Sequence, residues 1–150
     1  MSPPNVLAPF HLAIPVDDLV TAAAFYEGVL GCCRGRESAH WIDLNFFGHQ
    51  VVLHHAASRS GGEAFVNRVD SELIPVPHFG VVLDNVAFEA LENRVRSSET
   101  DFRIAPTTRF EGRIGEQRVF FLQDPCGNCL EFKSFSDPKM LFERDHSSYE

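Results

Sequence analysis

Two histidines and one glutamate interrupt short apolar segments of this chain. His11 begins the segment HLAIPV, His78 begins HFGVVL, and Glu131 lies inside CLEFKSF. A carboxylate within an apolar strand is costly unless it is paired or bound to a metal, and a divalent ion shared with two imidazoles removes that cost. Two His and one carboxylate on one side of a metal leave coordination positions open for substrate, oxygen or water. This ligand set suits Fe(II), and also Mn, Ni or Zn.

The segments around the two histidines form a loose internal repeat. Residues 10–18 resemble residues 77–85, and in each copy an acidic residue, Asp17 or Asp84, follows the His by six positions and can cap a helix. A single His in a strand is more often a core residue than a ligand. Two His at matching places, together with the in-strand Glu131, favour the metal site.

The periodicity of apolar residues predicts the elements that carry these side chains. One helix is expected over about residues 19–30, ended by Gly31, and a second over about residues 86–96 with a buried stripe of Phe88, Leu91 and Val95. The further predicted strands are Trp41–Asn45, His49–Leu53, Phe102–Ile104, Gln117–Gln123 and Asn128–Phe135. Asp124–Gly127 is a strong turn signal, and residues 106–116, which include Arg109, are predicted to be a solvated hairpin loop.

Each half of the chain is β-α-β-β-β in outline, and we expect a single domain built from two such modules. Module one spans about residues 8–56, a linker with the flexible stretch Ser58–Gly62 spans about 57–75, module two spans about 76–136, and a polar tail spans 137–150. Neither half can bury its own sheet alone. The strands of both halves can therefore curl around one shared cavity.

Composition excludes several classes of partner. The chain of 150 residues has a net charge of −8 and a pI of about 5.3, which argues against nucleic acid and against an anionic membrane surface. No apolar run approaches the roughly 18 residues of a membrane span, and MSPPNVLAPF has no features of a signal peptide. We therefore expect a cytoplasmic protein with four reduced cysteines.

Three phrases resemble the glyoxalase, bleomycin-resistance and extradiol dioxygenase (vicinal oxygen chelate) superfamily. They are PFHLAIPVDDLVTAAAFYEGVLG, PHFGVVL and FFLQDPCGNCLEFKSF; the likeness covers about residues 8–136, and its most specific piece is DP-x-GN-x-LE. It implies an α+β fold of two βαβββ modules that form a half-open eight-stranded barrel around a metal site. It also implies one divalent metal held by His11, His78 and Glu131, a small-molecule substrate, and a homodimer by analogy.

The resemblance also indicates a reaction. Aligning Gly48 with Gly127 places Val52 opposite Glu131, where glyoxalase I enzymes carry a fourth ligand that valine cannot supply. The phrases FFGHQ and PHFG most resemble predicted small extradiol-type dioxygenases. The implied activity is that of an Fe(II)-dependent dioxygenase acting on a small vicinal diol or enolizable compound.

The acid–base residue of such an enzyme is not at its usual place. Candidates are His49, Gln50 and His54, because strict strand alternation puts Gln50 and His54 on the site face, and His49 reaches it only after a one-residue shift. Phe121 stands where extradiol enzymes have a tyrosine. A glyoxalase-like lyase or isomerase and a non-catalytic binding protein of the bleomycin-resistance type remain alternatives. Lys133, on the face of Glu131, is a candidate for binding substrate charge.

Overall fold

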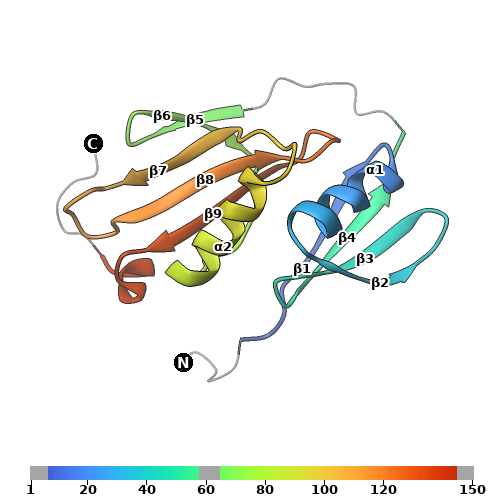
Figure 1. Ribbon diagram of the computed structural model, residues 1–150, viewed down its shortest axis with the longest axis horizontal. Helices are drawn as coiled ribbons and strands as arrows, with labels where there is room; N and C mark the ends of the chain where they lie inside the picture. The colour runs from blue at the N-terminus through green and yellow to red at the C-terminus, as the bar shows by residue number, and fades with distance from the viewer. Residues whose placement is uncertain (1–6, 58–64, 145–150) are drawn as a thin grey trace. The chain divides into compact units, whose positions relative to one another are not determined.

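The computed structural model describes residues 7–57 and 65–144, which belong to two units, residues 1–61 and 62–150 (Figure 1). Each unit is built from a sheet and a helix, which confirms the predicted α+β class. Within the described ranges, no helix is long and apolar enough to cross a membrane.

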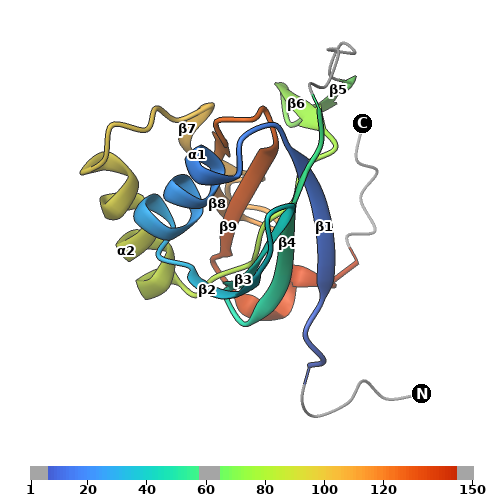
Figure 2. The same cartoon turned by 90° about the vertical axis from the view of Figure 1, so that its right-hand side faces the viewer.

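The first unit is a four-stranded sheet with a helix on one face (Figure 2). Its strands are β1 (His11–Val16), β2 (Cys33–Glu37), β3 (Trp41–Phe46) and β4 (His49–His55), in the order β1-β4-β3-β2. β1 runs parallel to β4, and the other neighbours are antiparallel. The helix packs Ala22, Ala23 and Tyr26, all fully buried, above the strands that carry Leu44 and Leu53.

That helix lies where the periodicity predicts it. It comprises α1 (Leu19–Ala24) and a π-helical turn η1 (Phe25–Val29), and Gly31 follows with a positive φ of 76°. The N-cap is Asp18, whose Oδ1 accepts from the Thr21 N–H at 2.9 Å, so the expected cap at Asp17 is wrong by one residue.

The second unit has a three-stranded sheet in the order β7-β8-β9, a hairpin and a helix. The elements are β5 (Phe65–Val69), β6 (Glu72–Val76), α2 (Asn85–Arg96), β7 (Ile104–Arg109), β8 (Gln117–Gln123), β9 (Cys129–Phe135) and the 3-10 turn η2 (Pro138–Leu141). Asp84 caps α2 as predicted, and the predicted stripe of that helix is buried. In the core, the ring of Phe88 contacts Phe120 of β8, which in turn contacts Phe132 of β9.

A segment preceding α2 extends this sheet in the way that β1 extends the first one. Bridges join Phe79 to Leu130 and Val82 to Lys133 in parallel, so the segment lies beside β9. Gly80 thus lies opposite Glu131, and a Cβ built on Gly80 would come within 1.6 Å of the Glu131 carbonyl oxygen. Only glycine permits this approach of the two backbones.

The two units share the same strand register. His11 pairs with Gln50 and Ala13 with Val52 in the first unit, while Gly80 faces Glu131 in the second. Counted from the histidine that begins each segment, Val52 and Glu131 therefore occupy equivalent positions. This is the correspondence that the sequence alignment predicts.

Some sequence expectations are corrected. The interval predicted to be only a linker contains the hairpin β5–β6, although its expected flexible stretch, Ser58–Gly62, lies outside the described residues. The predicted loop 106–116 begins as strand β7, and the strand expected at Phe102–Ile104 starts only at Ile104. The described sheets are four-, two- and three-stranded and separate, so the eight-stranded barrel stays a prediction.

Candidate metal centre

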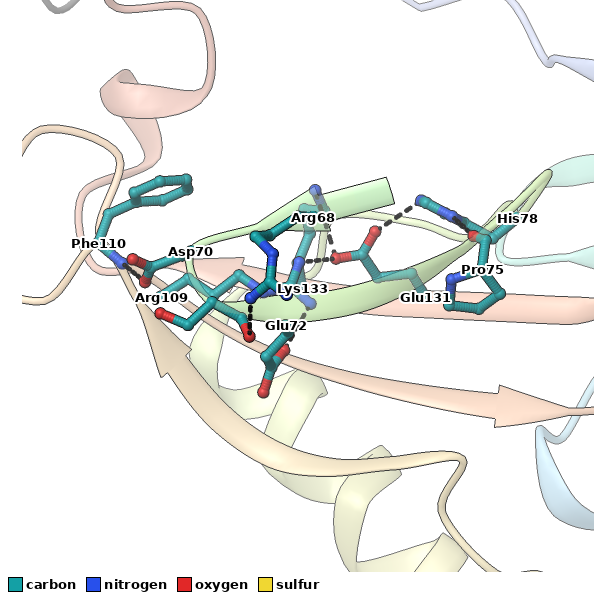
Figure 3. A network of polar contacts seen from close by, with 10 residues as sticks. Arg68, Asp70, Glu72, Pro75, His78, Arg109, Phe110, Glu131 and Lys133 are labelled. Carbon is teal, nitrogen blue, oxygen red and sulfur yellow. Dashed lines mark hydrogen bonds and ion pairs between the residues drawn. The ribbon is translucent and has the colours of Figure 1, made fainter. Parts of the chain in front are cut away.

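Glu131 is the centre of a polar network in the second unit (Figure 3). Its carboxylate is only 5% exposed, because β9 lies between β8 and the Phe79–Leu83 segment. Oε2 lies 2.9 Å from His78 Nε2, whereas Oε1 accepts from Arg109 Nη1 at 3.0 Å. The ammonium of Lys133 lies farther from Oε1, at 3.6 Å. The two carboxylate oxygens thus have separate partners.

His78 is held by a backbone carbonyl on its other side. Its Nδ1 lies 2.6 Å from the carbonyl oxygen of Pro75, an acceptor that requires a proton on Nδ1. In the neutral ring this leaves the Nε2 lone pair directed at Glu131 Oε2, an unfavourable pairing unless a cation lies between them. A proton serves in the metal-free protein, and the hydrogen bond to Glu131 accordingly raises the pKa of His78 above its ordinary value.

Arg109 fixes the other oxygen of Glu131 from the end of β7. Its side chain is 5% exposed and bonds two carboxylates, Glu131 through Nη1 and Glu72 on β6 through Nη2, each at 3.0 Å. The guanidinium also lies over the ring of Phe121, 5.5 Å from its centroid. Its buried Nε has no hydrogen-bond partner among the described residues. The sequence prediction of a solvated Arg109 is therefore wrong.

The cations around Glu131 keep it ionised. Burial by itself raises the pKa of this carboxyl, but His78, Lys133 and Arg109 together outweigh burial and lower it below the ordinary value. Glu131 is therefore an anion at neutral pH, as a carboxylate ligand must be.

His11 has a similar partner in the first unit. Its Nδ1 lies 2.8 Å from Oε1 of Gln50, its register partner on β4, so both side chains lie on one face of that sheet. An amide oxygen accepts a hydrogen bond from a protonated Nδ1, which leaves the Nε2 lone pair available to a metal. His11 and His78 thus both have a carbonyl oxygen at Nδ1.

The register of β4, which has no shift, decides which of the other candidate residues lie on the face of His11. Val52 and His54 follow Gln50 on the face of His11, whereas His49 points to the other face and accepts the Phe10 N–H on Nδ1 at 2.8 Å. His54 is exposed and pairs with Pro15, four residues beyond the His11 pairing, roughly 13 Å along the strand.

The structure brings His78 and Glu131 together but does not establish a contact between either of them and His11, which belongs to the other unit. Over the described ranges, no cluster of three or more His, Cys, Asp or Glu is assembled as a metal site. The His78–Glu131 pair nevertheless suits a metal. Two ligand atoms at right angles, each about 2.1 Å from an ion, are roughly 3.0 Å apart, close to the observed 2.9 Å.

Comparisons with known proteins agree with these features. The profile of the Glyoxalase/Bleomycin resistance protein/Dioxygenase superfamily matches residues 8–132. A glyoxalase/bleomycin resistance protein/dioxygenase structure from Alicyclobacillus acidocaldarius is 36% identical, with a TM-score of 0.77 over 95% of this chain and 100% of that chain. The resemblance predicted from the sequence is confirmed.

More distant structures share the fold. Lactoylglutathione lyase from Agrobacterium tumefaciens is 20% identical, with a TM-score of 0.61 over 89% of this chain and 96% of that chain. The fosfomycin resistance protein FosX from Listeria monocytogenes is 12% identical, with a TM-score of 0.65 over 90% of this chain and 98% of that chain. The search of curated proteins found no match.

Proposed function

Since this chain belongs to the glyoxalase/bleomycin resistance protein/dioxygenase superfamily, we propose that it is a metal-dependent enzyme whose ion is held by His11, His78 and Glu131. The proposed ion is Fe(II), and the proposed reaction is extradiol-type dioxygenation of a small vicinal diol or enolizable substrate. When bound, the ion would supply a chelation site for two substrate oxygens and a position for dioxygen.

One observation carries the proposal: His11 and His78 are hydrogen-bonded through the same ring nitrogen. His11 and His78 each have a carbonyl oxygen at Nδ1, which leaves both Nε2 atoms as possible ligands. Glu131 has Oε1 held by Arg109, so Oε2 is the oxygen left for the ion, and it already faces His78. Histidines held only for folding would not need to present the same nitrogen.

The register supports an open coordination sphere. Val52 occupies the position equivalent to Glu131 and has no donor atom, so the first unit supplies no carboxylate there. Three protein ligands leave positions for substrate and oxygen. Gln50 would position His11 through its amide oxygen.

Proton transfer is assigned within this proposal to His54. It shares the face of His11, whereas His49 does not and has Nδ1 occupied by the Phe10 N–H. Because His54 lies roughly 13 Å along the strand from Gln50, it would exchange protons with a small metal-bound substrate through intervening water.

A specific observation favours a second candidate, a glyoxalase-type lyase or isomerase. Phe121, at the extradiol tyrosine position, stacks edge-on against His78 with 5.1 Å between ring centroids and provides no hydroxyl group. A reaction in which the ion acts only as a Lewis acid would not need that hydroxyl. It would need a fourth ligand from Gln50, His54 or water.

Location and assembly belong to the same proposal. We place the protein in the cytoplasm, where its four cysteines, which form no disulfide in the described part of the chain, would stay reduced. We also expect a homodimer, by analogy with small relatives.

The test is to load the protein anaerobically with Fe(II), add nitric oxide as an oxygen surrogate, and record EPR spectra. A high-spin iron-nitrosyl signal in the wild type that is lost in Glu131→Ala and His11→Ala, and kept in His40→Ala, would support the open triad. Oxygen uptake with a panel of catechols would then identify the reaction.

Two other results would change the assignment. Bound iron without a nitrosyl signal would indicate a closed coordination sphere and favour the lyase or isomerase, for which turnover of a hemithioacetal is the assay. Absence of bound metal in the wild type would refute the proposed function altogether.

A further inference from the structure

Arg109 and Lys133, the two cations beside Glu131 Oε1, differ in how many hydrogen bonds they form with carboxylates. Arg109 is buried and forms hydrogen bonds with two carboxylates. The Lys133 side chain is 29% exposed, and its ammonium contacts the same Oε1 only at 3.6 Å, beyond hydrogen-bond distance. A lysine ammonium has three donors. Lys133 therefore retains donors that the network does not use.

The strand geometry places these donors beside the proposed metal ligand. Lys133 follows Glu131 by two residues on β9, so both side chains leave the same face of the sheet. Its neighbour across the parallel bridge is Val82, which is 45% exposed. Solvent therefore reaches this part of the face.

The charge of the network changes when an ion binds. With His78 neutral, as a metal ligand must be, Arg109 and Lys133 balance Glu131 and Glu72. A divalent ion adds two positive charges, so the group would carry a net charge of +2. Charges close together in a partly buried site are weakly screened, and an anionic ligand offsets this excess.

From these contacts we infer that Lys133 binds an anionic group of the substrate, so that the substrate is a vicinal-oxygen chelator with a carboxylate or a similar oxyanion. The inference rests on the proposed metal site. Arg109 acts differently, as a positioning residue for Glu131, because its side chain is buried and its Nη1 and Nη2 each already donate to a carboxylate of the protein. The Lys133 ammonium is a compact point charge, so it would bind an anion by charge rather than by the two parallel hydrogen bonds of a guanidinium.

The experiment compares two catechols on the Zn(II)-loaded protein by isothermal titration calorimetry at neutral pH. 3,4-Dihydroxybenzoate carries the anionic group and 4-methylcatechol does not. The measured quantity is the ratio of their dissociation constants in wild type, Lys133→Met and Lys133→Arg. Lys139→Met is the matched control, because Lys139 is the only other lysine and is exposed.

We expect the preference for 3,4-dihydroxybenzoate to fall about tenfold in Lys133→Met and to persist in Lys133→Arg and Lys139→Met. Intrinsic differences between the catechols cancel, because each ratio is compared between variants. An unchanged ratio in a Lys133→Met protein that still binds zinc and 4-methylcatechol would overturn this inference alone. Failure of the wild type to bind zinc, or to bind either catechol once loaded, would overturn it together with the proposed function.

Discussion

Replacing Arg109 by methionine tests how the buried network is stabilised. The substitution keeps an unbranched apolar stem but removes the guanidinium from between Glu131 and Glu72. In metal-free protein Glu131 would remain buried, with only His78 and the more distant Lys133 to offset its charge. Removing one partner of a buried ion pair leaves the other partner incompletely compensated.

The magnitude follows from the burial of the two pairs. The hydrogen bond to Glu131 is charge-assisted and buried on both sides, worth about 1.5–3 kcal/mol. The Glu72 carboxylate is 32% exposed, so that pair adds at most about 1 kcal/mol. The free energy of unfolding should therefore fall by about 2–4 kcal/mol, which corresponds to roughly 5–15 °C in Tm for a chain of this length.

Urea and thermal unfolding in the presence of EDTA, followed by circular dichroism, measure this change. Arg96→Met is the matched control, because Arg96 is 55% exposed and pairs with Glu92 on the surface of α2; it should cost less than about 1 kcal/mol. A double-mutant cycle with Glu131→Gln isolates the coupling between the two buried charges. If Arg109→Met unfolds within about 0.5 kcal/mol of wild type, the buried pair does not stabilise the fold and our reasoning fails.

Three further predictions concern the same unit and its metal-free state. Gly80→Ala should lower the free energy of unfolding by about 3 kcal/mol, because the new Cβ would meet the Glu131 backbone. Gly28→Ala is the control and should leave it unchanged, because a Cβ there meets no atom within 4 Å; equal urea midpoints for the two variants would contradict the prediction. NMR titration should show the pKa of His78 above its ordinary value in wild type and lower in Glu131→Gln. The His78–Glu131 pair then stabilises the fold fully below about pH 6.5, and its contribution to the free energy of unfolding decreases as the pH rises through the folded pKa of His78. An unchanged pKa of His78 in Glu131→Gln would refute the assignment of Glu131 as the cause of the shift. Asp84→Ala should cost about 1 kcal/mol through loss of the α2 N-cap, measured by thermal unfolding.

The local elements could be predicted from the sequence because their signals are local. The stripe of Phe88, Leu91 and Val95 repeats at helical spacing, and α2 buries those residues. Strand β8 has the predicted bounds, and the turn at Asp124–Gly127 follows from its turn residues. The equivalence of Val52 and Glu131 was also predictable, because each residue follows its turn glycine, Gly48 or Gly127, by four positions.

The partners of the charged groups were not predictable in this way. Glu131 was recognised as an in-strand carboxylate, but its contact with Arg109 spans 22 residues and the contact of Arg109 with Glu72 spans 37. Arg109 lies after a register shift in β7, a strand with weak apolar alternation, so nothing local distinguishes it from a loop residue.

The sequence by itself therefore determined both helices, the strands β1, β3, β4, β8 and β9, the internal repeat, the family and the residue types that could hold a metal. Only the tertiary structure decided that Arg109 is buried, that Oε1 and Oε2 of Glu131 have different partners, and that both imidazoles have carbonyl oxygens at Nδ1. The physical reason is that periodicity and turn chemistry act between neighbours in the chain. The partner of a buried charge is set instead by strand pairing between distant segments.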